Sequence, residues 1–197
     1  MHVYVLYAHP SADSFTRQVR DAFTRGLGEA GHSFEVGDLY AMGFRSDMDA
    51  AQYAREMGLD PDAPVPEDVR REQVKIDRAD ALAFVYPVWW SDCPAVLKGW
   101  FDRVWTLGYA YFYEDGEHRS SRIDIDKALV LCPAGHPAAH LEATGIAESM
   151  RRVMLHDRLL GVGVGEARME ILGGVVGFDE AVRKKHLERA HLLGKEF

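Results

Sequence analysis

The segment ALAFVYPVWWSDCPAVLKGWFDRV, residues 81–104, contains the pattern that decides the fold. Residues 81–86 are a short apolar run, which is typical of a parallel strand covered by helices on both faces. Pro94 then predicts the start of a helix. That helix has one apolar face, formed by Val96, Leu97, Trp100, Phe101 and Val104. Between strand and helix stand two adjacent tryptophans, Trp89 and Trp90, where a polar loop is expected.

The rest of the chain repeats this alternation of strand and helix. Further strands are predicted over residues 2–8, 33–39, 128–132 and 167–172. Further helices are predicted from Phe15 to a stop at Gly31 and over residues 66–80, 142–155 and 178–193. Strands that alternate with helices indicate an α/β fold with right-handed crossovers. We expect a doubly wound, five-stranded parallel sheet of order 2-1-3-4-5.

Length and composition predict one globular domain over residues 1–197. The apolar fraction is 47% and the formal charge is -8, with acidic and basic residues interleaved, which argues against nucleic-acid binding. No run approaches the roughly 20 apolar residues of a membrane span, so we expect a cytoplasmic protein without membrane insertion. Residues 40–64 are the best candidate for a flexible insertion. Residues 110–113, with a turn at Asp115 and Gly116, predict a short extended excursion.

The predicted topology places a ligand at the carboxyl ends of the first and third strands. Ligands of doubly wound sheets bind where the strand order reverses, which here brings residues 9–14 and 87–93 together. The first of these loops leads into a helix N-terminus, whose free N–H groups suit a phosphate. Ser14 and Thr16 add hydroxyl groups and His9 adds an imidazole. The aromatic second loop suits a flat conjugated ring.

The absence of nucleotide motifs narrows the choice of ligand. The first loop has neither GxxxxGK[ST] nor GxGxxG, and the run GVGVG at 161–165 precedes the fifth strand instead of following the first. A GxSxG elbow, which would indicate a hydrolase, is also missing from the sequence. A phosphate together with a planar ring, without a nucleotide motif, makes flavin the leading candidate.

Three segments, AHPSADSF, DLYAMGF and PVWWSDCPAVLKGWFDRV, together resemble the NAD(P)H:quinone oxidoreductase (DT-diaphorase-like) family of flavodoxin-like flavoproteins. The resemblance implies a non-covalent flavin, FAD or FMN, with NADPH or NADH as electron donor. It implies two-electron reduction of a quinone by ping-pong hydride transfer, and a homodimer.

The resemblance also assigns residues to the cofactor. The flavin phosphate would be held by His9, Ser14, Phe15 and Thr16. The isoalloxazine ring would lie beside Pro87, Val88, Trp89, Trp90 and Ser91, and beside the loop of Pro133, Ala134, Gly135 and His136. The segment AYFY would lend Tyr111 and Tyr113 to the pocket of a neighbouring subunit, and Phe178 is a further candidate for the quinone pocket.

The sequence departs from the family after the fourth strand. The family commonly has Thr-Thr-Gly-Gly followed by a Tyr and a His that assist hydride transfer, whereas this chain reads CPAGHPAAHLEATG. Gly135 and His136 can supply the N–H groups of the turn, and His140 lies close to the position of the missing tyrosine. We therefore count His136 and His140, with Tyr111 and Tyr113, as the catalytic candidates.

Several alternatives remain open at this level. Neighbours on an extended segment point to opposite sides, so one of Trp89 and Trp90 can be a core residue. Ser14 and Thr16 suit a helix cap, and His9 a turn. His136 and His140 lack the further ligands of a metal site, so they are not assigned as metal ligands. Cys93 lacks a neighbouring base, so it is not assigned as a catalytic thiol.

A second class of function is also possible on the same fold. It is a flavin-binding electron carrier, or a redox-sensing ancillary subunit of a membrane transport system. A phosphoacceptor domain is set aside because only Asp92 lies near an expected acidic position.

Overall fold

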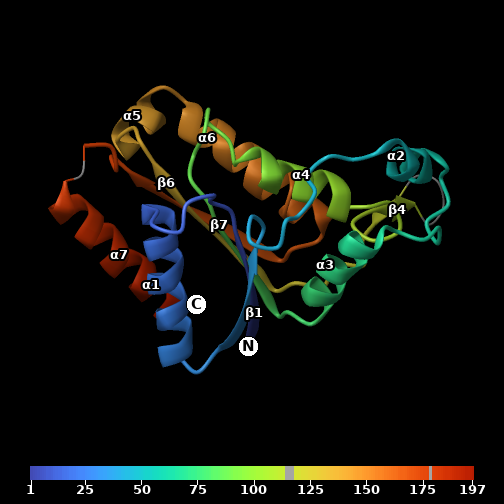
Figure 1. Cartoon of the computed structure of the whole chain (residues 1–197), viewed down its shortest axis with the longest axis horizontal. Helices are drawn as coiled ribbons and strands as arrows, with labels where there is room; N and C mark the ends of the chain where they lie inside the picture. Colours follow the sequence, from blue (N-terminus) through green and yellow to red (C-terminus); the bar gives the residue numbers. More distant parts are fainter. Residues whose placement is uncertain (114–117, 178) are drawn as a thin grey trace.

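The computed structural model describes residues 1–113, 118–177 and 179–197 of the chain. Its centre is a parallel sheet of β1 (His2–Tyr7), β2 (Ser33–Asp38), β3 (Ala81–Val85), β6 (Lys127–Ala134) and β7 (Glu166–Gly173). The strand order is β2-β1-β3-β6-β7 (Figure 1). Counted along the chain, this is the predicted order 2-1-3-4-5, so the sheet topology is confirmed.

Helices cover both faces of the sheet, and each face has its own large core. On one face lie α1 (Phe15–Glu29) and α7 (Glu180–Lys195). On the other lie α3 (Glu67–Asp77), α4 (Ala95–Val104) and α6 (Ile146–Arg151) (Figure 1). Val3 and Val5 point into the first core and Tyr4 and Leu6 into the second, all fully buried. This two-sided burial explains why the strands read as continuous apolar runs.

Helices α1 and α7 pack closely because glycines stand at their contact. A Cβ atom added to Gly26 would lie 2.2 Å from the carbonyl oxygen of His191, and one on Gly194 would lie 2.2 Å from that of Phe23. Any larger side chain would therefore push the two helices apart. The close contact fixes α1, and with it the position of its N-terminus at the edge of the sheet.

A buried carboxylate ties α3 to the sheet and to α4. Glu72 is 1% exposed and accepts hydrogen bonds from the Tyr4 hydroxyl at 2.5 Å and the Trp100 indole N–H at 2.8 Å. The Lys75 ammonium lies 2.8 Å from the same carboxylate. Burial and the Glu72 charge raise the pKa of Tyr4, so this hydroxyl stays protonated and acts as a donor.

The insertion 40–64 is more ordered than the sequence predicts, because it contains helix α2 (Ala50–Met57). Gln52 donates to the carbonyl oxygen of Arg103 at 2.8 Å and accepts from its Nε at 2.9 Å. Arg103, which is fully buried, also makes two hydrogen bonds to Asp68, at 2.5 and 2.9 Å. The expectation of a flexible insertion is therefore wrong for α2, which these buried groups anchor.

The predicted helix 142–155 is divided into three pieces. They are α5 (Ala138–Ala143), α6 and the π-helix η1 (Arg152–Asp157), which is followed by the 3-10 turn η2 (Leu160–Val162). The break falls at Gly145, whose φ of +74° is incompatible with a continuing α-helix. The single-helix prediction is therefore wrong.

The excursion at 110–113 is a small hairpin of β4 (Phe112–Tyr113) and β5 (Arg119–Ser120). The expected turn at Asp115 and Gly116 and the candidate Phe178 lie outside the described residues. Among the residues that are described, no helix combines the length and the apolar character needed to span a bilayer.

Candidate functional site

The candidate site lies where β1 and β3 end side by side. Tyr7 pairs with Val85 in the sheet, and the Ala8 N–H donates to the Val85 carbonyl at 3.1 Å. Beyond this point the chain turns to opposite faces of the sheet, because β1 leads into α1 and β3 leads into α4 (Figure 1). The predicted meeting of these two loops is therefore observed.

The first loop is held by its own short side chains. The Ser11 N–H donates to His9 Nδ1 at 3.0 Å, so in the neutral imidazole the proton is on Nε2. Burial lowers the pKa of His9, which favours this neutral form. Ser14 caps α1 by accepting from the Arg17 N–H at 3.1 Å, and its hydroxyl lies 3.1 Å from that of Tyr7. The capping role considered for Ser14 is therefore present.

Phe15 and Thr16 open helix α1 with their side chains directed inward. Their exposed fractions are 8% and 3%. The first N–H groups of a helix have no carbonyl partner within the helix. In α1 these include the backbone N–H groups of Phe15 and Thr16, which face the loop end of the helix. A ligand at this helix end would therefore meet the backbone of Phe15 and Thr16 and not their side chains.

The two tryptophans lie on a tight turn. The Trp89 N–H donates to the Asp92 carbonyl at 3.0 Å, and the Asp92 N–H donates back at 3.1 Å. Trp90 and Ser91 have φ values of +50° and +66°, the conformation of a type I′ turn, which normally takes Asn and Gly. Such strain costs about 1–3 kcal/mol for each residue and is concentrated at functional sites.

The turn exposes both indoles. Trp90 is 102% exposed and Trp89 is 41% exposed, so neither is a core residue. The alternative that one of them is a core residue is therefore wrong, because the backbone turns here instead of staying extended. The Trp89 ring packs edge-on against His9, with ring centroids 6.0 Å apart. Over the described ranges, the N–H groups of Trp90 and Ser91 donate to no backbone acceptor.

The loop after β6 closes the third side of the site. The Pro133 carbonyl accepts from the Val88 N–H at 2.8 Å, and the Ala134 carbonyl accepts from the Val175 N–H at 3.1 Å. Pro133 and Ala134 are therefore buried parts of the sheet edge, whereas Gly135 is exposed. A Cβ atom on Gly135 would lie 2.9 Å from Val176 Cγ2, which places this loop directly against the segment after β7.

Two exposed histidines stand at the start of α5. Their rings, those of His136 and His140, have centroids 4.8 Å apart. The His136 carbonyl accepts from the Gly174 N–H at 2.9 Å, which fixes this residue to the loop after β7. In the described part of the chain, no three His, Cys, Asp or Glu residues are grouped so as to hold a metal ion.

Comparison with known proteins agrees with this architecture. A family model described as the flavodoxin-like fold matches residues 1–193. The structure of the NAD(P)H:quinone oxidoreductase from Methanothermobacter marburgensis is 62% identical, with a TM-score of 0.95 over 99% of this chain and 98% of that one.

The chain belongs to the NAD(P)H:quinone oxidoreductase family.

Two curated relatives extend this family assignment. A ribosyldihydronicotinamide dehydrogenase-like protein of Penicillium crustosum is 30% identical over 78% of this chain. An uncharacterized NAD(P)H oxidoreductase of Haemophilus influenzae is 28% identical over 96% of it. The chain spans 65% of the length of the Penicillium protein and 92% of that of the Haemophilus protein.

This family member does not bring all the catalytic candidates together within one chain. Tyr111 and Tyr113 belong to the β4–β5 hairpin region, at the opposite end of the molecule from α5, which carries His140 (Figure 1). Tyr113 is 55% exposed and Tyr111 is partly buried, with the Arg119 guanidinium 5.5 Å from its ring centroid. The single chain therefore separates these tyrosines from the two histidines.

An ion pair behind the tryptophan turn escaped the sequence analysis. Arg158 donates to both carboxylate oxygens of Asp92, at 2.9 and 3.0 Å. Burial alone would raise the pKa of Asp92, but hydrogen bonds from Arg158 and from the Cys93 N–H hold that pKa below its usual value. The two residues are 66 positions apart, and no local sequence pattern predicts their pairing. Burial raises the pKa of the Cys93 thiol to about 12, in agreement with an unreactive role.

A hollow of about 520 Å³ adjoins the first loop on its β2 side. Its walls include His9, Ser11, Arg17 and Tyr40. Tyr40 is the first residue of the insertion, so the insertion begins at the candidate site. The remainder of the insertion leads away from it, to α2 (Figure 1).

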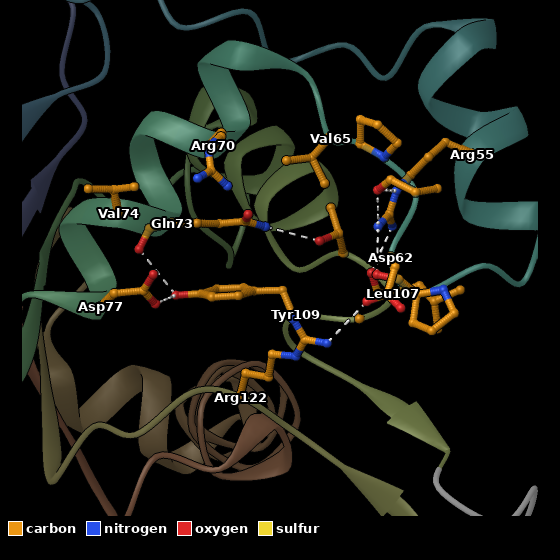
Figure 2. Close-up of a pocket in the computed structure, with 15 residues that line it drawn as sticks. Arg55, Asp62, Val65, Arg70, Gln73, Val74, Asp77, Leu107, Tyr109 and Arg122 are labelled. Atoms are coloured by element: carbon orange, nitrogen blue, oxygen red, sulfur yellow. Dashed lines mark hydrogen bonds and ion pairs between the residues drawn. The ribbon is translucent and has the colours of Figure 1, made fainter.

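A second hollow, of about 330 Å³, lies elsewhere, beside the C-terminal end of α3 (Figure 2). Several of its polar groups make hydrogen bonds or ion pairs within the hollow. Tyr109 donates to Asp77 at 2.8 Å, Arg122 lies 3.5 Å from Asp62, and Arg55 donates to the Ala63 carbonyl at 2.9 Å (Figure 2). Asp77 ends the helix that leads into the amino end of β3, so this hollow is not part of the site at the carboxyl ends.

Proposed function

We propose that this protein is a flavin-dependent NAD(P)H:quinone oxidoreductase that binds FAD or FMN at the carboxyl edge of its sheet. The observation that carries the proposal is the strained turn with the fully exposed Trp90, which stands beside a capped helix N-terminus. Backbone strain is concentrated at functional sites, and this strained turn presents an entire indole to solvent. A flat, phosphate-bearing group fits both features.

The flavin phosphate would bind at the start of α1. The backbone N–H groups of Phe15 and Thr16 and the positive end of the helix dipole favour an anion there. His9 is held with its Nε2–H available as a further donor. Ser14 carries no charge, and it would contribute by capping the helix and so orienting these groups.

The ring would bind against Pro87, Val88, Trp89, Trp90 and Ser91. The exposed N–H groups of Trp90, Ser91, Gly135 and His136 suit the polar edge of an isoalloxazine, and they would stabilise negative charge on it. When bound, a flavin supplies the two-electron chemistry between a nicotinamide and a quinone. The protein would bind the nicotinamide and the quinone one after the other over the same face of the flavin ring. Such a shared site predicts ping-pong kinetics.

The proton of the product hydroquinone would pass through the two histidines. His136 and His140 are exposed, adjacent and placed beside Gly135 at the edge of the site. Either imidazole can hold or deliver a proton at a ring nitrogen. They would take the role of the tyrosine and histidine that the family commonly uses.

We also propose that the enzyme is a cytoplasmic homodimer. The β4 strand, which carries Tyr113, and helix α5, which carries His140, lie at opposite ends of one chain (Figure 1), but a second copy can bring them together. NADPH or NADH would be the donor, and a quinone the acceptor.

The test is a titration of purified protein with FMN and with FAD, followed by anaerobic addition of NADPH or NADH and then a benzoquinone. The proposal predicts retained visible bands that bleach with the nicotinamide and recover with the quinone. A protein that retains neither flavin would contradict it. Retained flavin with slow turnover would favour a carrier or a redox-sensing ancillary subunit.

A further inference from the structure

Two ordinary residues occupy left-handed positions in the turn of Trp89, Trp90, Ser91 and Asp92, so the surrounding structure must hold this conformation. The turn has two backbone hydrogen bonds of its own, between Trp89 and Asp92. In most hairpins glycine or asparagine would relieve the strain. Here the sequence supplies neither, and the compensation has to come from outside the turn.

Asp92 links the turn to the protein behind it. One of its carboxylate oxygens accepts from the Cys93 N–H at 2.7 Å, which fixes the side chain against the start of α4. Both oxygens accept from Arg158, in the bidentate geometry that restricts a carboxylate most strongly. Since Asp92 is the last residue of the turn, its orientation sets the direction in which the chain passes from the turn into α4.

Arg158 is itself held on several sides. Its side chain is 9% exposed and its guanidinium lies 5.5 Å from the Phe101 ring centroid and 3.5 Å from Cys93 Sγ. Its carbonyl accepts from the Trp105 indole N–H at 2.8 Å. An arginine fixed in this way has little freedom to follow a displaced partner.

The π-helix η1 explains how Arg158 reaches the turn. The Arg158 N–H donates to the Val153 carbonyl at 3.1 Å, which is the five-residue spacing of a π-helix. A π-helical turn inserts one residue relative to an α-helix and so rotates the residues that come after it. Such turns occur frequently at functional sites.

We infer that Arg158 is a positioning residue, which through Asp92 holds the tryptophan turn in its strained conformation and thereby sets the surface offered to the flavin ring. The last part of this inference rests on the proposed function. The first part concerns the protein alone and is tested without a ligand. Removing the guanidinium should allow the turn to relax while the sheet and helices stay intact.

The experiment compares Arg158→Met, Arg158→Lys and Asp92→Asn with the control Arg168→Met. Arg168 is 53% exposed and its Nε lies 3.5 Å from Glu166, far from the turn in sequence. Amide hydrogen exchange is measured on the ligand-free proteins, residue by residue. We expect the Trp89 and Asp92 amides to exchange about tenfold faster in Arg158→Met, with a smaller change in Arg158→Lys and none in the control.

The same proteins are then titrated with FMN and FAD. We expect about tenfold weaker binding in Arg158→Met and Asp92→Asn, together with shifted visible bands of the bound flavin. The double variant should add little to either single variant, because both remove one interaction. Unchanged exchange at Trp89 and Asp92, or faster exchange spread equally over α1, would overturn the positioning role. A wild-type protein that retains no flavin would instead overturn the proposed function, and the exchange result would still decide whether Arg158 positions the turn.

Discussion

The imidazole of His9 packs edge-on against the indole of Trp89, with ring centroids 6.0 Å apart and planes inclined by 61°. These two side chains come from loops that follow different strands, and their contact joins the helix N-terminus to the tryptophan turn. The joined surface has a donor-rich end and an aromatic end. Such a surface suits one ligand that carries both a phosphate and a ring.

Trp90→Ala should weaken flavin binding without harming the fold. Base and ring stacking on an aromatic side chain contributes about 1–3 kcal/mol, so we expect the dissociation constant to rise by about tenfold or more. Since Trp90 is fully exposed, the free energy of unfolding of the ligand-free protein should change by less than about 0.5 kcal/mol. Flavin titration and urea unfolding measure the two quantities.

The control for this substitution is Tyr53→Ala. Tyr53 is also an exposed aromatic residue, but it lies on α2, away from the site. It should leave flavin binding unchanged. Equal weakening by both substitutions would count against a specific role for Trp90.

Ser14→Ala should lower both stability and flavin affinity. Loss of an N-cap costs about 1 kcal/mol of unfolding free energy, and here the cap also shapes the phosphate-binding end of α1. Asp49→Ala is the matched control, because Asp49 caps α2 through the Gln52 N–H at 2.8 Å. It should cost similar stability and leave the flavin dissociation constant unchanged. If Ser14→Ala lowers stability but leaves flavin affinity unchanged, Ser14 acts only as a helix cap and has no part in flavin binding.

Substitution of both histidines should slow quinone reduction. If His136 and His140 handle the proton, the variant with alanine at both positions should lose about 10²-fold in turnover with a quinone. His32→Ala, a change directly before β2, serves as the control. Turnover is compared under saturating nicotinamide. Undiminished turnover in the double variant would show that the two histidines do not transfer the proton.

Asp68→Asn should destabilise the protein in a pH-dependent way. Hydrogen bonds from Arg103 hold the pKa of Asp68 below its usual value of 3.8, so the carboxylate stabilises the fold above that pH. The substitution should cost about 2 kcal/mol at pH 7. The difference from wild type should shrink as the pH falls below 3.8 and through the lower pKa of the folded state.

Asp102→Asn is the control for this measurement. Asp102 pairs with Lys98, and both side chains are 46% exposed, so its loss should cost less than about 1 kcal/mol. Urea unfolding over a pH series measures all three proteins. A pH-independent difference between wild type and Asp68→Asn would contradict the assignment of stability to the ionised carboxylate.

Local sequence patterns predict the sheet well because each strand is buried on both faces. The apolar run of β3 and the proline before α4 are signals that depend only on nearby residues. The alternation of strands and helices predicts the strand order, and three sequence motifs predict the family; both predictions are confirmed. The predicted continuous helix from Glu142 fails at Gly145, because helical spacing alone does not show a left-handed glycine.

The site is predicted only in part, since its decisive features are non-local. The two loops and their residue types follow from the sequence. The strained turn at Trp90 and Ser91 does not, because neither residue type favours it. The Arg158–Asp92 pair and the anchoring of α2 by Arg103 join distant segments, and a single sequence carries no record of such contacts.

The most direct test of the central claim is the visible spectrum of the desalted protein after incubation with FMN or FAD. Our account predicts that flavin bands remain in the wild-type protein, are lost or weakened in Trp90→Ala, bleach anaerobically with NADPH or NADH, and return with a benzoquinone. A wild-type protein that emerges colourless after both flavins would contradict it.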